Sequence, residues 1–318
     1  MLKISILVPV YGVEKYIEEC ARSLFEQTYE DIEYVFVDDC SPDSSIAILE
    51  RTAKEYPDRL SQVKIIRHEE NQGLGGARLT AMLNATGDYV THADSDDLMP
   101  KDGISILARR AFETRADFID GAFEEWADGK SGKKTLPPHT TKEKLLKKML
   151  CQNIVKNRIW GRLYRRSMLM NHYVLSVKGI DYSEDYCVVP RAIYYSTMAY
   201  TDETVYYYRT DNATSYTHTL SERHITSHIR ACEYVAEFMT EIPPDSRYYR
   251  ATDIGIANAW RCVAENGYPT AKAEEYFPYE PTDIICRLVV ALWKRRCAMK
   301  TAEIIYRLYR RLYVTLCT

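Results

Sequence analysis

The sequence lacks a long hydrophobic run and has almost no excess of charge of either sign. No stretch approaches the roughly 18 consecutive apolar residues that a membrane-spanning helix needs, and the apolar run near the N-terminus is too short for a secretory signal. The 42 lysines and arginines against 45 aspartates and glutamates give a net charge of -3, which argues against a chain that coats nucleic acid. We therefore expect no spanning helix, no secretory signal and no nucleic-acid partner.

Paired cysteine motifs are also absent. Nine cysteines are scattered through the 318 residues without a single Cys-x-x-Cys, so a zinc knuckle or a disulfide framework is disfavoured. Unpaired thiols are typical of a reducing compartment, which predicts a cytoplasmic protein. The length favours one large domain with an appendage.

Buried strands and one-sided helices alternate through the first hundred residues. Residues 4–10 form a continuous apolar run, typical of a strand buried on both faces of a parallel sheet. The pattern then repeats, with further strands predicted over 32–37, 63–66 and 88–91 and helices over 44–56 and 76–86. Successive βαβ units of this kind place ligand-binding residues at the carboxyl ends of the strands.

Three carboxylates follow the fourth predicted strand within four positions, namely Asp94, Asp96 and Asp97. Neighbouring ionised carboxylates repel one another, and an all-oxygen set of ligands favours Mg²⁺ or Mn²⁺ over zinc. We interpret Asp94-Ser95-Asp96 as a metal and diphosphate site. An isolated Asp-x-Asp is more often a solvated turn before a helix. The choice between that turn and a metal site therefore depends on the other motifs of the sequence.

Polar residues also follow the second and third strands. Asp39 ends the second strand, where we expect it to lie outside the apolar core; a turn before a helix cap would explain it equally well. The segment Asn71-Gln-Gly-Leu-Gly-Gly-Ala-Arg78 contains glycines that let backbone approach a ligand at a helix N-terminus. It is not a Gly-x-Gly-x-x-Gly fingerprint, so a dehydrogenase is disfavoured.

Five short motifs occur together in a fixed order over residues 1 to about 120. They are Ile6-Leu-Val-Pro-Val-Tyr11, Ser23-Leu-x-x-Gln27-Thr, Val37-Asp-Asp-x-Ser-Pro-Asp43, Asn71-x-Gly-Leu-x-x-Ala-Arg78 and Asp94-Ser-Asp-Asp97. In order and spacing the set resembles the nucleotide-sugar domain of family 2 glycosyltransferases with the GT-A fold. Cys40 stands where that family commonly has Gly or Asn, which affects donor identity more than reaction class.

The resemblance implies a role for each matched residue. Pro9, Tyr11 and Asp39 would line the base and ribose pocket, and Asn71 and Arg78 would help to hold the nucleotide. Asp94, Ser95 and Asp96 would act on the sugar diphosphate through Mn²⁺ or Mg²⁺, with either Asp96 or Asp97 as the direct metal ligand.

Later segments resemble the acceptor side of the same family. Asp181-Tyr-Ser-Glu184-Asp185 opens a helix, and the resemblance implies that Asp185 is the catalytic base of an inverting transfer, with Glu184 orienting the acceptor or the base. Locally, such a pair is ordinarily a favourable charge at a helix start. Arg209 and Ser215 resemble residues that close over the diphosphate, although a structural salt bridge would explain Arg209 nearly as well.

The last hundred residues have helical apolar spacing. In the final helix the apolar side is expected to hold Ile305, Leu308, Tyr309, Leu312 and Leu316, and the other side Arg307, Arg310 and Arg311. This pattern is typical of a helix lying on an anionic membrane, and equally of one packed on the catalytic domain. We predict a GT-A-like catalytic domain over 1–218, with a nucleotide-sugar half (1–120) and an acceptor half (121–218), and a helical C-terminal region over 219–318.

The fold predicted is α/β, with a mostly parallel sheet flanked by helices. The activity predicted is an inverting, metal-dependent hexosyl transfer from a nucleotide diphosphate donor, a UDP-sugar, to a hydroxyl of a cell-surface glycan or its lipid-linked precursor. The location predicted is the cytoplasm, with the inner face of the plasma membrane as the surface for the basic helices. Two alternatives are a metal-dependent sugar nucleotidyltransferase, for which no basic triphosphate-gripping loop follows the first strand, and a catalytically inactive sugar-nucleotide-binding module.

Overall fold

The structure, a computed structural model, describes residues 1–151, 157–212, 221–241 and 246–316. The chain divides into two compact units. The first unit comprises Met1–His139, Arg158–Asp181 and Tyr195–His218, and the second comprises Thr140–Asn157, Tyr182–Tyr194 and Thr219–Thr318. The sequence suggested a single boundary after residue 218, whereas two earlier segments group with the C-terminal helices.

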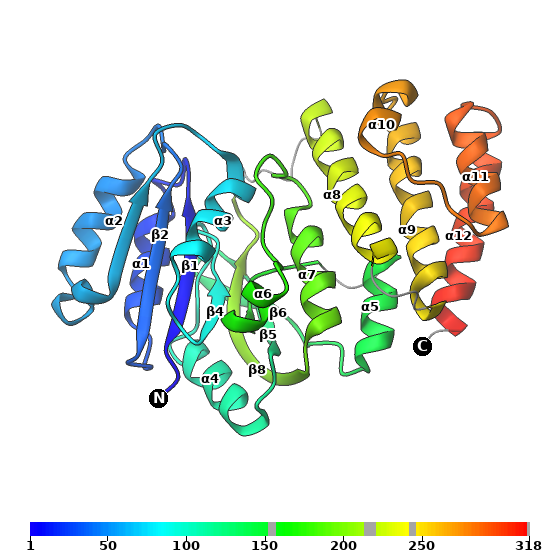
Figure 1. The fold of residues 1–318 in the computed structure, drawn as a ribbon. Helices are drawn as coiled ribbons and strands as arrows, with labels where there is room; N and C mark the ends of the chain where they lie inside the picture. The colour runs from blue at the N-terminus through cyan, green and yellow to red at the C-terminus, as the bar shows by residue number, and fades with distance from the viewer. Residues whose placement is uncertain (152–156, 213–220, 242–245, 317–318) are drawn as a thin grey trace. The chain divides into compact units, whose positions relative to one another are not determined.

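The first unit is built on one mixed sheet (Figure 1). Among the described residues the strand order is β3-β2-β1-β4-β7-β5-β6, and β8 pairs with β5. The strands are β1 (Ile4–Val10), β2 (Ile32–Asp38), β3 (Val63–Arg67), β4 (Tyr89–His92), β5 (Phe118–Ala127), β6 (Lys130–Thr135), β7 (Arg162–Arg165) and β8 (Met198–Arg209). The first four strands pair in parallel, while β7 runs antiparallel to β4 and β5. The predicted mostly parallel, GT-A-like sheet is confirmed.

Strand β1 lies in the centre of this sheet. All seven of its residues are buried, because it pairs on both sides and helices cover its faces. The helices of the first unit are α1 (Ile17–Phe25), α2 (Ser45–Lys54), the 3-10 helix η1 (Pro57–Gln62), α3 (Gly73–Asn84), α4 (Gly103–Thr114) and α6 (Arg166–Asn171). The register sets Val10 beside Asp38 and Leu7 beside His92, so β1, β2 and β4 end at one edge of the sheet.

The second unit is helical, and the predicted helical C-terminal region is confirmed. Its helices are α5 (Lys142–Leu150), α7 (Glu184–Tyr195), α8 (Glu222–Glu241), α9 (Ser246–Glu265), α10 (Thr270–Tyr276), α11 (Ile284–Lys294) and α12 (Met299–Leu316). The last residue of α7, Tyr195, is grouped with the first unit. Helix α9 is central in this unit, since α5, α8 and α11 all pack on it. In the part of the chain that the structure describes, no helix combines the length and the apolar character needed to cross a membrane.

Candidate functional site

Three loops meet at the carboxyl edge of β1, β2 and β4. Pro9 is buried within β1, whereas Tyr11, just beyond the strand, is 53% exposed. The turn after β1 is joined to the turn after β2, because the Gly12 N–H donates to Ser41 Oγ at 2.9 Å. An exposed aromatic ring thus stands at the rim of this edge, where a planar ligand could stack on it.

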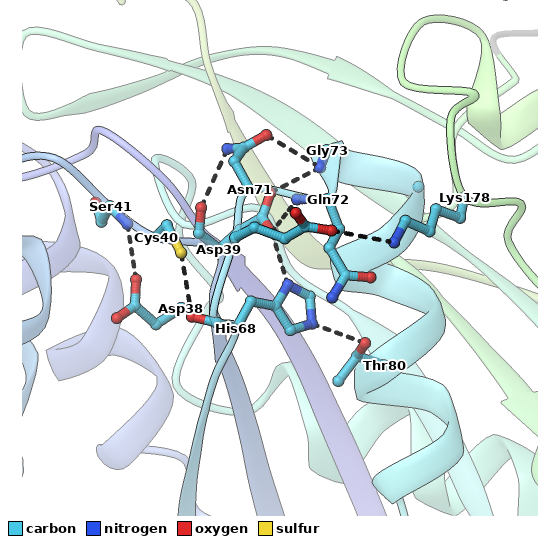
Figure 2. Close-up of polar contacts among 12 residues, drawn as sticks. Asp38, Asp39, Cys40, Ser41, His68, Asn71, Gln72, Gly73, Thr80 and Lys178 are labelled. Atoms are coloured by element: carbon cyan, nitrogen blue, oxygen red, sulfur yellow. Dashed lines mark hydrogen bonds and ion pairs between the residues drawn. The ribbon is translucent and has the colours of Figure 1, made fainter.

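Asp39 is the hub of the second loop (Figure 2). Its Oδ1 lies 2.6 Å from His68 Nδ1 and accepts the Gln72 N–H at 2.8 Å, while its Oδ2 accepts the Gly73 N–H at 2.9 Å. The Asn71 side-chain amide donates to the Asp39 carbonyl oxygen at 3.1 Å. The side chain is 3% exposed, so Asp39 is buried, within a polar network at the end of its strand rather than among apolar side chains.

The reason for this burial is the N-terminus of α3. The first backbone N–H groups of a helix have no partner within the helix, and a carboxylate from a neighbouring strand satisfies two of them here. His68 completes the arrangement, since its Nε2 lies 2.8 Å from Thr80 Oγ1, about two turns further along α3. Asp39 therefore fixes the junction of β2, β3 and α3.

The glycines at the start of α3 make room for protein rather than for a ligand. A side chain at Gly75 would meet the carbonyl oxygens of Val177 and Ile180, and one at Gly73 would meet the Asp181 carboxylate. Asp181 Oδ1 also accepts the Gly75 N–H at 3.2 Å. This corrects the interpretation of these glycines as an approach path for a ligand.

Asp94 and Arg78 form an ion pair at the end of β4. Arg78 is 2% exposed and its Nη2 donates to Asp94 Oδ1 at 2.8 Å, while the Asp94 side chain is 26% exposed. A buried arginine thus holds one oxygen of a half-buried carboxylate. Beside them, Ser95 is buried in the same turn.

Asp97 is buried, whereas Asp94 and Asp96 are half-buried, and both of its carboxylate oxygens accept hydrogen bonds. Oδ1 accepts the Arg209 N–H at 2.7 Å, and Oδ2 accepts the Tyr206 hydroxyl at 2.9 Å. Burial first, and then the charges of Asp96 and Asp94, raise the pKa of Asp97 well above its usual range. Asp97 therefore ties the acidic turn to β8.

Asp96 is half-buried, and its Oδ2 accepts a hydrogen bond from the Asn212 side-chain amide at 2.7 Å. The Arg209 guanidinium donates to the Asp96 carbonyl oxygen at 2.6 Å and to Glu19 Oε2 at 2.5 Å, and it lies over the ring of Tyr16. Arg209 is thus engaged within the protein, as the salt-bridge alternative expected. Ser215 lies outside the described residues.

The acidic turn suits a metal that is shared with a substrate. Within the described residues, no group of three or more His, Cys, Asp or Glu side chains is arranged to hold a metal ion. Asp94 and Asp96 are nevertheless two half-buried carboxylates in one turn, and Mg²⁺ is commonly bound by one or two carboxylates together with substrate phosphates. The donor set fits such an ion through these two residues, with Asp97 less accessible.

Glu184 and Asp185 belong to the second unit, in the first turn of α7. Glu184 is buried and Asp185 is half-buried. The loop before them is tied to α8, because the Tyr182 N–H donates to Ser227 Oγ at 2.9 Å and Ser183 Oγ lies 2.9 Å from His228 Nδ1. Burial and then Arg261 lower the pKa of His228 to about 4, so this imidazole is neutral near pH 7.

The sequence did not identify His68, Tyr206 and Asn212 as parts of the site, and it named Asp181 only as the first residue of the Glu184-Asp185 motif, without its contact to α3. His68 follows β3, so the rule that polar residues gather at the carboxyl ends of parallel strands would have found it. The other three are more than a hundred positions from their partners, and local sequence carries no signal for such contacts.

A mostly parallel sheet with an acidic turn beside its central strand defines this chain as an α/β protein of the GT-A type. Residues 5–172 match the family described as Glycosyl transferase family 2. The chain therefore belongs to glycosyl transferase family 2.

Two proteins of Bacillus subtilis are among those similar to the chain. It is 31% identical over 191 residues to the uncharacterized glycosyltransferase EpsJ of Bacillus subtilis, an alignment that covers 57% of this chain and 53% of EpsJ. It is 33% identical over 213 residues to the putative glycosyltransferase EpsH of the same organism, covering 65% of this chain and 60% of EpsH. The chain thus covers less than two thirds of the length of either relative.

The fold is shared with a solved structure. The structure of S. aureus TarS 1–349 in complex with UDP superimposes with a TM-score of 0.66 at 17% identity, over 98% of this chain and 92% of that one. TarS 1–349 has also been solved in complex with UDP-GlcNAc, with a TM-score of 0.62. At this level of identity the likeness shows the fold alone.

Proposed function

We propose that this chain is an inverting glycosyltransferase that moves a sugar from a UDP-sugar to a hydroxyl group of a glycan acceptor. The observation that carries the proposal is the pair of half-buried carboxylates, Asp94 and Asp96, at the end of β4 and beside the exposed Tyr11 loop of β1. This is the edge of a parallel sheet where ligands bind. Family membership and the UDP complexes of TarS support the choice of donor.

The donor would be held by the residues matched to the family motifs. Pro9 and Tyr11 would contact the uracil and ribose, and Asn71 and Arg78 would help to hold the nucleotide. The family motif assigns Asp39 a contact with the nucleotide. Its three hydrogen bonds within the protein give it a second task, which is to fix the start of α3.

Asp94 and Asp96 would hold Mn²⁺ or Mg²⁺ together with the donor diphosphate. Bound there, such an ion offsets the negative charge that develops on the departing diphosphate. A mannosyltransferase from Pyrobaculum calidifontis has been solved with GDP-Man and Mn²⁺, with a TM-score of 0.52 and 16% identity to this chain. Arg78 keeps one oxygen of Asp94 in place, and Asn212 does the same for Asp96.

Asp185 would act as the general base. It would take the proton of the acceptor hydroxyl as that oxygen forms a bond to the anomeric carbon, while the bond from the anomeric carbon to the diphosphate oxygen breaks and its electron pair leaves with UDP. General-base catalysis contributes roughly 10² to 10⁴ fold, and positioning of the two reactants supplies much of the remainder. Glu184 would orient the acceptor or Asp185.

The acceptor would be a hydroxyl of a cell-surface glycan or of its lipid-linked precursor, and the reaction would take place on the cytoplasmic side of the plasma membrane. The similar proteins include poly(ribitol-phosphate) glycosyltransferases, such as TarS of Staphylococcus aureus, which supports a polymer with free hydroxyl groups as the acceptor.

The proposal is tested by a screen for binding. The chain is heated with each of a set of nucleotide sugars and Mn²⁺, and the unfolding transition is recorded. A donor present at 100 times its dissociation constant should stabilise the chain by about 2.7 kcal/mol. Stabilisation by a UDP-sugar and UDP supports the proposal, whereas stabilisation by nucleoside triphosphates alone, with release of pyrophosphate, would favour a nucleotidyltransferase.

A further inference from the structure

The outer helices of the second unit expose a concentrated set of aliphatic side chains. On α11, Ile284 is 81% and Leu288 is 52% exposed, and on α12 the exposures run from 57% to 77% for Ile304, Leu308, Leu312 and Leu316. These six make up nearly half of the large hydrophobic side chains that are exposed among the described residues. Single exposed leucines are normal, but a cluster of them marks an interaction surface.

The six residues lie on the sides of α11 and α12 that face away from α9. Tyr306 of α12 donates its hydroxyl to the Ile254 carbonyl of α9 at 3.4 Å, and the Lys294 ammonium of α11 lies 4.1 Å from the ring centre of Trp260. The two helices also contact each other through the rings of Trp293 and Tyr306, at 5.4 Å. The side chains buried on α12 are Ala302, Tyr306 and Val314.

The aliphatic residues of α12 recur at every fourth position, so they form a ridge along the exposed face. The sequence placed Leu308, Leu312 and Leu316 opposite the arginines. In the structure Arg307 and Arg311 are exposed on the same outward side, directly beside the ridge. The opposite side of α12 is the packed one, since it carries the buried residues Ala302, Tyr306 and Val314. Apolar and basic groups therefore share one surface.

The charge on this surface is mainly positive. The exposed cationic residues on α11, on α12 and in the turn between them include Arg287, Arg295, Lys300, Arg307 and Arg311. From 284 to 316 the sequence contains a single acidic residue, Glu303, whose side chain is 19% exposed and is shared by Arg307 and Arg261. An ordinary solvated surface carries interspersed charges of both signs.

We infer that the α11–α12 face docks on an anionic lipid surface. The ridge of Ile304, Leu308, Leu312 and Leu316 would enter the boundary between headgroups and acyl chains, with Ile284 and Leu288 beside it, and the arginines would contact lipid phosphates. A second copy of the chain is a poorer occupant, because a two-fold contact would bring the same cations together from both copies. This inference does not depend on the proposed sugar transfer.

The test measures binding of the full chain to vesicles in the absence of donor, metal and acceptor. Vesicles of phosphatidylcholine are compared with vesicles that also contain phosphatidylglycerol, by co-sedimentation at rising salt. The wild-type chain should bind the anionic vesicles and release them as salt screens the attraction. The ridge variant Leu308→Ser/Leu312→Ser should bind about tenfold or more weakly, and Arg287→Gln/Arg311→Gln should lose about fivefold per charge.

Leu83→Ser is the matched control, since Leu83 on α3 is 52% exposed and lies in the first unit. It should leave vesicle binding unchanged, and all variants should melt as the wild type does because the replaced side chains are exposed. Equal binding to neutral and anionic vesicles would overturn the inference. Full binding of the ridge variant to anionic vesicles would also overturn the inference. So would a wild-type chain that is dimeric in solution and does not bind vesicles, if the ridge variant is monomeric.

Discussion

The Tyr206 hydroxyl connects Asp97 with the backbone of the acidic turn. It donates to Asp97 Oδ2 and accepts the Asp94 N–H, both at 2.9 Å, although the partners are more than a hundred positions apart in sequence. Burial first, and then Asp97 and Asp94, raise the pKa of Tyr206 well above its usual value, so the hydroxyl keeps its proton. The shape of the acidic turn after β4 therefore depends on β8.

Tyr206→Phe should destabilise the chain and weaken metal-dependent donor binding. The change leaves two buried polar groups without this partner, at a cost of about 1–3 kcal/mol. Urea unfolding measures the loss, and calorimetry with UDP and Mn²⁺ measures the affinity. Tyr207→Phe is the control on the same strand, where the ring contact with Trp126 is retained. Equal stability of both variants would show that the Tyr206 hydroxyl does not organise the turn.

Asp39→Ala should reduce both nucleotide affinity and stability. Two backbone N–H groups at the start of α3 and the His68 ring lose their acceptor, which should cost about 1–3 kcal/mol. His68→Gln leaves the carboxylate in place, so it should cost less and preserve more of the UDP affinity. Loss of stability with unchanged UDP affinity for Asp39→Ala would confine this residue to a structural role.

Asp185→Asn should separate binding from chemistry. Shape and donor affinity should stay, while transfer falls by roughly 10² to 10⁴ fold, as expected when a general base is removed. A helix-start charge would instead cost about 0.3–1 kcal/mol of stability with turnover intact. Donor affinity and single-turnover transfer are both measured, and near-wild-type transfer would mean that another residue is the base.

Asp120 should stabilise the first unit at neutral pH, and this stabilisation should be lost in acid. Burial would raise the pKa of this carboxyl, but Arg162 and Arg158 outweigh it and lower the pKa below its usual value. Its contribution is therefore complete above the unfolded pKa of about 3.9 and is lost as pH falls below that value. Asp120→Asn leaves two buried arginines without their carboxylate, 2.6 Å and 3.1 Å away, and should cost about 3–5 kcal/mol.

The control for Asp120→Asn is Glu203→Gln, which removes an exposed partner of Arg109 and should change stability little. Urea unfolding at neutral pH and again at pH 3 measures both variants. The difference between wild type and Asp120→Asn should shrink at the lower pH. A difference that stays constant would contradict the assignment of the charged form to Asp120.

The sequence revealed most of the parallel half of the fold because local patterns determine it. A run such as Ile4–Val10 is apolar at every position only where both faces are covered, and the rule for strand ends then located Asp39 and Asp94. What it did not reveal depends on contacts between distant segments. Neither the burial of Asp39 under α3 nor the link from Tyr206 to Asp97 has a local signature.

Helix α12 shows the same limit. Helical spacing tells which residues share a side, but the side that is packed depends on α9 and α11, which contact Tyr306 and leave Leu308 and Leu312 exposed. The grouping of 140–157 and 182–194 with the C-terminal helices likewise follows from tertiary packing.

Release of UDP from a UDP-sugar tests the central claim most directly. The chain is incubated with the donor identified by the binding screen, with Mn²⁺ or with excess EDTA, and free UDP is measured over time. We expect UDP to be released with Mn²⁺, and we expect no release in excess EDTA or by the Asp96→Ala variant. The control variant Asp58→Ala, which changes an exposed carboxylate on η1, should release UDP as the wild type does. UDP release that is equally fast in EDTA or with Asp96→Ala, or no release from any bound nucleotide sugar, would contradict the account.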